Sequence, residues 1–300
     1  MGCCRTLLLF APAVLAGWHE DVLLVTNPAT NVTRFHEIVG PIASLVNQSY
    51  TGSEGCTYYD PNHSRYLPAS WRESMRVDPA ATGGMRVFFF ENDKPPSDPE
   101  YRGVVAFRGT DLGPGDTVSV RADACADALL AGAPLPTDCS DFAPEVLDYY
   151  SSALSFVRSR VLAARSGADI LFSGHSLGAL LAALVVAALT DDGAPTPPAL
   201  VFSSPGFDAV AIRKGLDPTR IAPRVLAVLA DDNDPVYHDA VGNISEGAPC
   251  LFDTGDDAAC DRCFQGSGRT GADCEACFLR HHIFGHYLAL VATPCTPQGG

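Results

Sequence analysis

One stretch decides the fold of this chain: Ile170-Leu171-Phe172-Ser173-Gly174-His175-Ser176-Leu177-Gly178. It places the pattern G-x-S-x-G between an apolar run of strand length and the apolar segment Leu177–Leu189, which has the length of a buried helix. A serine in this pattern lies on a strained turn between strand and helix, and the two glycines let the flanking backbones approach closely. The stretch therefore predicts an α/β fold in which Ser176 is a nucleophile at the end of a buried strand.

Strand-like and helix-like segments alternate along the rest of the chain. We expect strands at Met85–Phe90, Val104–Phe107, Asp169–Ser173, Ala199–Ser203 and Arg224–Leu229, and helices at Trp18–Tyr50 and Phe142–Ala164. The first two strands should form a hairpin, whereas Asp111–Asp138 lacks a sustained period and should be a loop. The alternation predicts an α/β-hydrolase with a mostly parallel central sheet flanked by helices, as a single domain over residues 18–300.

The chain is acidic, with 35 Asp and Glu against 20 Lys and Arg and a formal net charge of −15 over 300 residues. This charge would repel the phosphates of nucleic acids and anionic membrane surfaces. No apolar run reaches the roughly 18 residues needed to span a bilayer. We therefore expect no nucleic-acid partner and no obligate protein partner, and only transient contact with a lipid interface.

The N-terminus has the pattern of a secretory signal peptide over residues 1–17. A positive start is followed by the apolar stretch Thr6–Leu15 and by small residues suited to cleavage. The alternative is lipidation, because Gly2 fits a myristoylation pattern and two cysteines follow it. Nine of the eleven cysteines lie beyond residue 17, and this density favours an oxidising compartment, with one thiol left over. Four glycosylation sequons point the same way, at Asn31, Asn47, Asn62 and Asn243. We expect a secreted protein or one of the secretory-pathway lumen.

A serine nucleophile needs a base within hydrogen-bond reach and an acid that holds the base in the right tautomer. In this fold the acid follows a later strand and the histidine comes last. The candidate acids follow the expected strand Arg224–Leu229 and are Asp231, Asp232 and Asp234. The candidate bases are His238, His281, His282 and His286.

Four motifs resemble, in order and spacing, those of the class 3 lipases, the family of the secreted fungal triacylglycerol lipases. They are Val104-Val105-Ala106-Phe107-Arg108-Gly109-Thr110, Gly174-His175-Ser176-Leu177-Gly178-Ala179, Phe202-Ser203-Ser204-Pro205-Gly206 and Asn233-Asp234-Pro235-Val236. The resemblance implies a Ser-Asp-His triad with Asp234 as the acid. Asp231 and Asp232 stay open as alternatives, because a loop can present any of three neighbouring carboxylates. After Val236 the sequence departs from the family's pattern, since Tyr237-His238 replaces the usual proline.

The resemblance also implies an oxyanion hole made by the backbone amides of Thr110 and Leu177, together with the Thr110 hydroxyl. Such donors stabilise a tetrahedral intermediate by about 3 kcal/mol each. By the same resemblance, the segment Asp111–Asp138 is the lid of the active site, and disulfides join Cys56 to Cys295 and Cys125 to Cys139.

Our prediction for the base is His286. It opens the aromatic and aliphatic segment His286–Val291 before Cys295, as the family's histidine opens its last helix. His281 is the alternative, because its spacing to Phe284 resembles the family's H-x-x-[YF], and His282 could be a surface residue or a metal ligand. The predicted catalytic set is therefore Ser176, Asp234 and His286.

Two CxxC pairs lie in a Gly- and Asp-rich insertion over residues 247–280. Cys260-x2-Cys263 and Cys274-x2-Cys277 would suit a structural four-thiolate zinc site in a cytosolic protein. In an exported protein, disulfides are favoured. The insertion lies between the acid and the histidine, so we expect it to border the mouth of the active site.

Together these features predict a carboxylic ester hydrolase that works through an acyl-enzyme and needs no cofactor. Lipid esters are the favoured substrates, with triacylglycerol, phospholipid and soluble esters all open. The alternatives are a lipase-like fold that serves as a non-catalytic binding or signalling module, and an interaction protein stabilised by zinc at the CxxC pairs.

Overall fold

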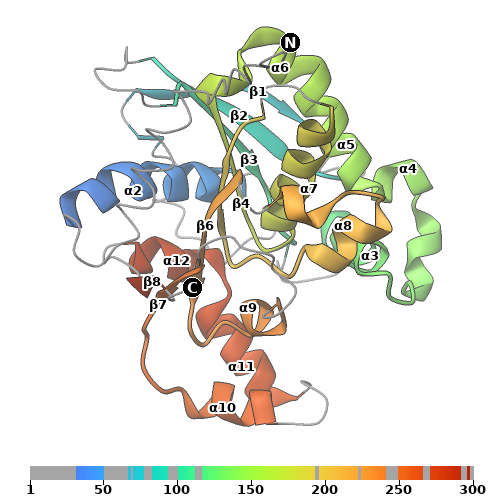
Figure 1. Ribbon diagram of the computed structural model, residues 1–300. Helices are drawn as coiled ribbons and strands as arrows, with labels where there is room; N and C mark the ends of the chain where they lie inside the picture. The colour runs from blue at the N-terminus through green and yellow to red at the C-terminus, as the bar shows by residue number, and fades with distance from the viewer. Residues whose placement is uncertain are drawn as a thin grey trace, which may run out of the picture.

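The computed structural model describes residues 32–50, 67–68, 70–77, 83–93, 101–111, 117–192, 196–221, 224–240, 249–265, 271–291 and 296–297. Its centre is an eight-stranded sheet whose strands lie side by side in their order along the chain (Figure 1). The strands are β1 (Trp71–Val77), β2 (Val87–Asn92), β3 (Gly103–Phe107), β4 (Ile170–His175), β5 (Ala199–Phe202), β6 (Val225–Asp231), β7 (Pro249–Phe252) and β8 (Thr296–Pro297). Strands β3 to β7 are parallel, and β1, β2 and β8 pair antiparallel with their neighbours. The predicted mostly parallel sheet is confirmed, whereas β1, β7 and β8 were not expected.

Helices cover both faces of the sheet (Figure 1). They are α2 (Val32–Gln48), α3 (Val118–Ala131), α4 (Pro144–Leu147), α5 (Tyr149–Phe156), α6 (Leu162–Ala164), α7 (Leu177–Asp191), α8 (Asp208–Arg213), α9 (Pro235–Ala240), α10 (Ala258–Gln265), α11 (Ala272–His281) and α12 (Phe284–Leu290). The helix expected over residues 142–164 is thus divided into short helices, with a π-helical turn over Val157–Val161.

Alternating side chains of the strands feed two separate cores. In β2, Val87 and Phe89 pack with α5 and α7 on one face, and Phe88 and Phe90 pack with α2 and α12 on the other. This follows from the two-residue period of a strand, and both faces are apolar because helices cover both. Helix α7 is apolar all round because it lies in the middle of the larger core.

The segment expected to be a loop, Asp111–Asp138, contains helix α3. The Thr117 hydroxyl caps the helix by accepting a hydrogen bond from the Val120 amide, and Gly132 ends it in the left-handed conformation. The apolar period was missed because α3 buries small side chains such as Ala122 and Ala126 rather than large ones.

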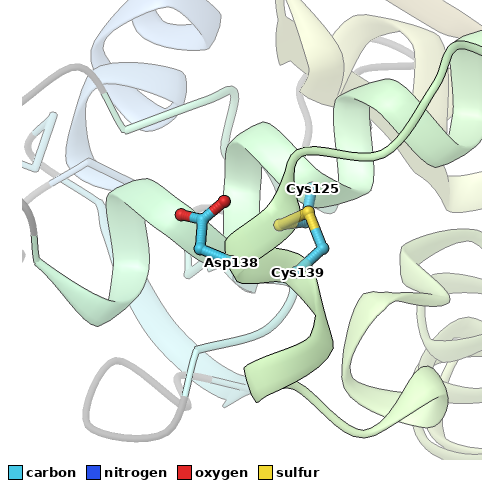
Figure 2. Close-up of side chains that lie close together, drawn as sticks. All are labelled: Cys125, Asp138 and Cys139. Carbon is cyan, nitrogen blue, oxygen red and sulfur yellow. A yellow bond between two sulfur atoms is a disulfide. The ribbon is translucent and has the colours of Figure 1, made fainter.

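Buried charges attach α3 to the strand that precedes it. Arg108, directly after β3, donates to Asp123 at 2.5 Å and to Ser119 at 3.1 Å, and both ends of the Arg108–Asp123 pair are 1% exposed. Asp123 also accepts from the Asp111 amide and the Tyr149 hydroxyl. Burial raises the pKa of Asp123, and Arg108 and these hydrogen bonds oppose that effect only in part. The predicted disulfide Cys125–Cys139 links the middle of α3 to the 3-10 turn Thr137–Asp141, with Asp138 beside it (Figure 2).

The cysteine-rich insertion forms a helical hairpin of α10 and α11 below the sheet (Figure 1). Disulfides Cys260–Cys277 and Cys263–Cys274 link the two helices. The expectation of disulfides is confirmed, and the alternative of a four-thiolate zinc site is wrong because these disulfides use all four sulfurs. Cys250 is also disulfide-bonded. The expected Cys56–Cys295 pair lies outside the described residues.

The described residues include only part of what was expected about glycosylation and about membrane-spanning segments. Asn47 is 3% exposed on α2, and a glycosylation acceptor has to be accessible, so this sequon is not evidence for export. The other sequons and the segment 1–31 lie outside the described residues. Within the described ranges, no helix is long and apolar enough to cross a membrane.

Candidate active site

Ser176 lies on a sharp turn between β4 and α7. Its backbone has φ 56° and ψ −128°, a strained conformation for a residue with a side chain. The turn is held because the Ser176 amide donates to the Phe202 carbonyl, and the Ser176 carbonyl accepts from the amides of Ala179 and Leu180. The predicted strand–turn–helix around Ser176 is present.

Both glycines of the pattern are required by close backbone contacts. A Cβ on Gly174 would lie 2.4 Å from the backbone of Gly178, and a Cβ on Gly178 would lie 2.1 Å from the Phe107 carbonyl oxygen. No side chain fits at such distances. The glycines therefore bring β3, the turn and the start of α7 into contact, which places Ser176 beside the residues that follow β3.

His282, and not the predicted His286, is the histidine that contacts Ser176. Its Nε2 lies 2.9 Å from the Ser176 hydroxyl, and its Nδ1 lies 3.0 Å from both carboxylate oxygens of Asp234. A carboxylate only accepts, so Nδ1 carries the proton and Nε2 accepts from the serine. Ser176, His282 and Asp234 thus form a connected chain of hydrogen bonds.

The prediction of His286 at this position is wrong because another carboxylate holds its side chain. The His286 Nε2 bonds to Asp231, and the alternative, His281, places its Nδ1 2.8 Å from the same oxygen. His282 comes between them in sequence, at the end of α11, where the chain turns before α12. The remaining candidate, His238, lies on α9, the helix that follows Asp234.

Asp234 is buried at 0% exposure directly after β6, and four groups besides His282 donate to its carboxylate. They are the Ser203 hydroxyl, the Tyr287 hydroxyl at 2.6 Å, and the amides of Val236 and Tyr237. Burial alone would raise the pKa of Asp234, but the charge of His282 and these hydrogen bonds outweigh it and hold the pKa below its usual value. The carboxylate is therefore ionised and fixed in orientation.

Ser203 and Tyr287 were not predicted as site residues. Ser203 has φ 44° and points its hydroxyl at Asp234 and at His282 Nδ1, 2.9 Å away. The sequence signals for Ser203 were its position after an apolar strand and its place in the lipase-like motif Phe202–Gly206, neither of which assigned it a contact with the acid. No pattern in the sequence could have paired Tyr287 with Asp234.

His175, next to the serine, holds the backbone of His282. Its Nε2 donates to the His282 carbonyl at 2.7 Å, and its Nδ1 accepts from the Tyr50 hydroxyl at 2.8 Å. Tyr50 in turn accepts from the Gly109 amide at 3.1 Å. Burial, followed by the charge of His282, lowers the pKa of His175 well below its usual value, so this imidazole is neutral. The network connects α2, the serine turn and the segment after β3.

The predicted oxyanion residues, Thr110 and Leu177, line one pocket with Ser176. Leu177 is the first residue of α7, where backbone amides have no partner within the helix. The Thr110 hydroxyl donates to Asp127 on α3 at 2.7 Å. Burial, and then the neighbouring Asp123, raise the pKa of Asp127 to about 7, against the opposing effects of the Thr110 hydrogen bond and His282.

The pocket has a volume of about 630 Å³ and extends from the Ser176 hydroxyl between α3 and α8. Its apolar wall includes Leu180, Val210, Val236 and Phe278. The polar groups gather at the end near Ser176, apart from Arg213, which donates to the Leu130 carbonyl. Apolar walls with a few polar groups at one end are typical of a site for a small organic substrate.

No protein-family model matches the sequence, and no curated protein matches it. Among solved structures, the extracellular lipase LipA from Serratia marcescens superposes with a TM-score of 0.50 at 14% identity, covering 87% of this chain and 51% of that chain. A lipase from Rhizopus microsporus var. chinensis gives a TM-score of 0.45 at 17% identity, covering 76% of this chain and 77% of the other. A Yarrowia lipolytica lipase gives 0.42 at 14% identity, covering 73% and 78%.

These similarities concern the fold. The mostly parallel sheet, its flanking helices and the serine turn between β4 and α7 define the chain as an α/β-hydrolase in fold, as the sequence predicted.

Proposed function

We propose that this protein is a serine hydrolase that cleaves carboxylic esters, with Ser176 as nucleophile, His282 as base and Asp234 as the acid that orients it. The observation that carries the proposal is the unbroken chain from the Ser176 hydroxyl through both ring nitrogens of His282 to a buried carboxylate. Ser176 attacks the ester carbonyl as His282 takes its proton, and the alcohol leaves with that proton. Water, activated by His282, then releases the acid from Ser176.

The oxyanion of each tetrahedral intermediate would be bound by the amides of Thr110 and Leu177. Support comes from their place in the pocket beside Ser176 and from the unpaired amides at the start of α7. Electrostatic stabilisation of this kind is the largest single contribution to catalysis in many enzymes. The Thr110 hydroxyl is turned towards Asp127, so its role is to fix the orientation of Thr110.

The proposed substrates are esters with an apolar acyl chain, as in lipids. The apolar wall of the pocket and the motif resemblance to class 3 lipases support this choice. Leu129 on α3, Leu135 and Ile212 on α8 are large apolar side chains that are 40%, 49% and 64% exposed, and they could contact a lipid surface. Export to an oxidising compartment completes the proposal, and it is supported by the disulfides Cys125–Cys139, Cys260–Cys277 and Cys263–Cys274.

The test is hydrolysis of p-nitrophenyl esters of short and long acyl chains by the wild type and by three variants. Ser176→Ala and His282→Ala should each lower kcat by at least about 10⁴-fold, because each removes a member of the triad. His286→Gln is the comparison variant and should retain far more activity than His282→Ala, because His286 contacts Asp231 instead of Ser176. Activity retained by His282→Ala, or lost equally in His286→Gln, would contradict the assignment.

A further inference from the structure

A cluster of two histidines and one carboxylate lies beside the triad without belonging to it. Asp231 at the end of β6, His281 at the end of α11 and His286 on α12 bring one oxygen and two ring nitrogens within 4.8 Å of one another. Asp231 is fully buried, His281 has a side chain 9% exposed, and His286 has one 24% exposed. The cluster is therefore closed on the protein side and open to solvent on the side of His286.

The two carboxylate oxygens of Asp231 have different partners, and only one of them contacts the histidines. Oδ1 accepts from the Asn233 amide at 2.8 Å and from the Thr254 hydroxyl at 2.7 Å. Oδ2 faces the Nδ1 of His281 and the Nε2 of His286. The carboxylate is thus held by the protein through one oxygen and presents the other.

The far side of the His281 ring faces a second carboxylate. Its Nε2 lies 3.2 Å from Asp257, which Arg280 also contacts at 2.5 Å. A neutral imidazole carries one proton, so if Nε2–H donates to Asp257, then Nδ1 presents a lone pair to Asp231. A lone pair and a carboxylate oxygen 2.8 Å apart repel each other unless a cation lies between them. A metal ion would supply this cation, and an added proton on the ring is the competing explanation.

We propose that Asp231, His281 and His286 bind a divalent transition-metal ion of the zinc type. Two imidazole nitrogens and one carboxylate oxygen form a ligand set that zinc accepts, with water in the fourth position on the open side. The Asp257–His281 contact is the outer-shell hydrogen bond by which a carboxylate typically orients a metal-binding histidine. Ligand atoms of a tetrahedral zinc ion stand about 3.3 Å apart. Binding therefore needs Asp231 to separate from His281 by about half an ångström, and from His286, which lies closer to the same oxygen, by more.

The ion would connect three segments that carry the proposed triad. Asp231 lies three residues before Asp234 on the same connection, His281 precedes His282, and His286 precedes Tyr287, which donates to Asp234. The role of the ion would be structural, because none of its three ligand residues lines the pocket that contains Ser176. The two other groupings of possible ligand residues in the described ranges include cysteines whose sulfurs form disulfides, as with Cys125 and Cys139 (Figure 2).

The test is zinc binding to the folded, untagged protein after chelator treatment, with zinc chloride as the only probe. Calorimetry should give one site per chain, and a saturating amount of zinc should raise Tm by several degrees, because an ion that binds only the folded state stabilises it. His286→Gln should weaken zinc binding at least tenfold, and so should His281→Gln. The glutamine amide that replaces the His286 ring can still donate to Asp231, so this variant keeps a hydrogen bond but loses a ligand.

Asp261→Asn is the matched control, since Asp261 is an exposed carboxylate of the same insertion. It should bind zinc as the wild type does. No zinc binding by the wild type, or equal binding by His286→Gln, would overturn the proposal and leave the extra proton as the explanation. Neither measurement uses ester hydrolysis, so the metal site and the proposed activity succeed or fail independently.

Discussion

Replacing Asp127 with asparagine should make the folded protein more stable at alkaline pH than the wild type. Asp127 keeps its proton in the folded state up to a pKa of about 7, because burial disfavours its charge, whereas the unfolded chain releases the proton near 3.8. The folded state therefore binds more protons between these values, and its free energy of unfolding falls as the pH rises through this window. The asparagine side chain would carry no charge and could still accept from the Thr110 hydroxyl.

The magnitude follows from the two pKa values. A shift of about 3 units at 1.36 kcal/mol each gives a loss of about 4 kcal/mol across the whole window, of which about 3 kcal/mol falls between pH 5 and pH 8. Asp127 is half-buried at the pocket wall, so solvent screening makes these figures upper bounds. The difference in stability between Asp127→Asn and the wild type should thus grow by up to about 3 kcal/mol from pH 5 to pH 8.

Urea unfolding at several pH values, followed by tryptophan fluorescence, measures this difference. Asp138→Asn is the matched control, because Asp138 is also a half-buried carboxylate and lies next to the Cys125–Cys139 disulfide, away from the pocket (Figure 2). It should follow the wild-type pH dependence. The reasoning is refuted if Asp127→Asn keeps the wild-type slope from pH 5 to pH 8, or if Asp138→Asn changes that slope equally.

Two further substitutions test how the site is positioned. Gly178→Ala should lower the free energy of unfolding by about 3 kcal/mol, because the added Cβ would lie 2.1 Å from the Phe107 carbonyl oxygen. Urea unfolding measures this loss. Gly40→Ala is the control and should cause no loss, because the space around the added Cβ is open. Tyr50→Phe should lower stability by about 1–3 kcal/mol, because it leaves His175 Nδ1 and the Gly109 amide buried without their shared partner. It should also lower kcat more than it raises KM, because the His282 carbonyl loses its fixed support, and an unchanged kcat would count against this positioning role. Tyr101→Phe is the control, since that hydroxyl bonds to Ile38 away from the site.

The serine turn was predictable because its chemistry is local. Strand, glycines, Ser176 and helix are consecutive, so one stretch of sequence contains both the reactive residue and the elements that hold it. The position of Asp234 near Ser176 was also predictable, because the parallel strands end at the same edge of the sheet and Asp234 lies three residues beyond the end of β6.

The histidine was not predictable in the same way. His281, His282 and His286 lie within six residues, and each faces a carboxylate after β6. Which ring reaches Ser176 depends on the residue at which α11 ends and on the turn before α12. The pattern that favoured His286 predicted a helix near the right place, since α12 begins two residues earlier at Phe284, but a helix start does not fix where a side chain points.

The two disulfides between α10 and α11 have a consequence for how the protein matures. His282 follows the last residue of α11, so the proposed base is carried by a hairpin with two covalent links. The linked cysteines are 17 and 11 residues apart in sequence, and closing a loop of this size is worth about 3 kcal/mol of stability. A chain folded under reducing conditions would have Ser176 on its turn and Asp234 after its strand, but only noncovalent contacts to hold the third partner. Thiol oxidation would then act as the final assembly step, and the chain would gain its full reactivity only after it leaves the reducing environment of its synthesis.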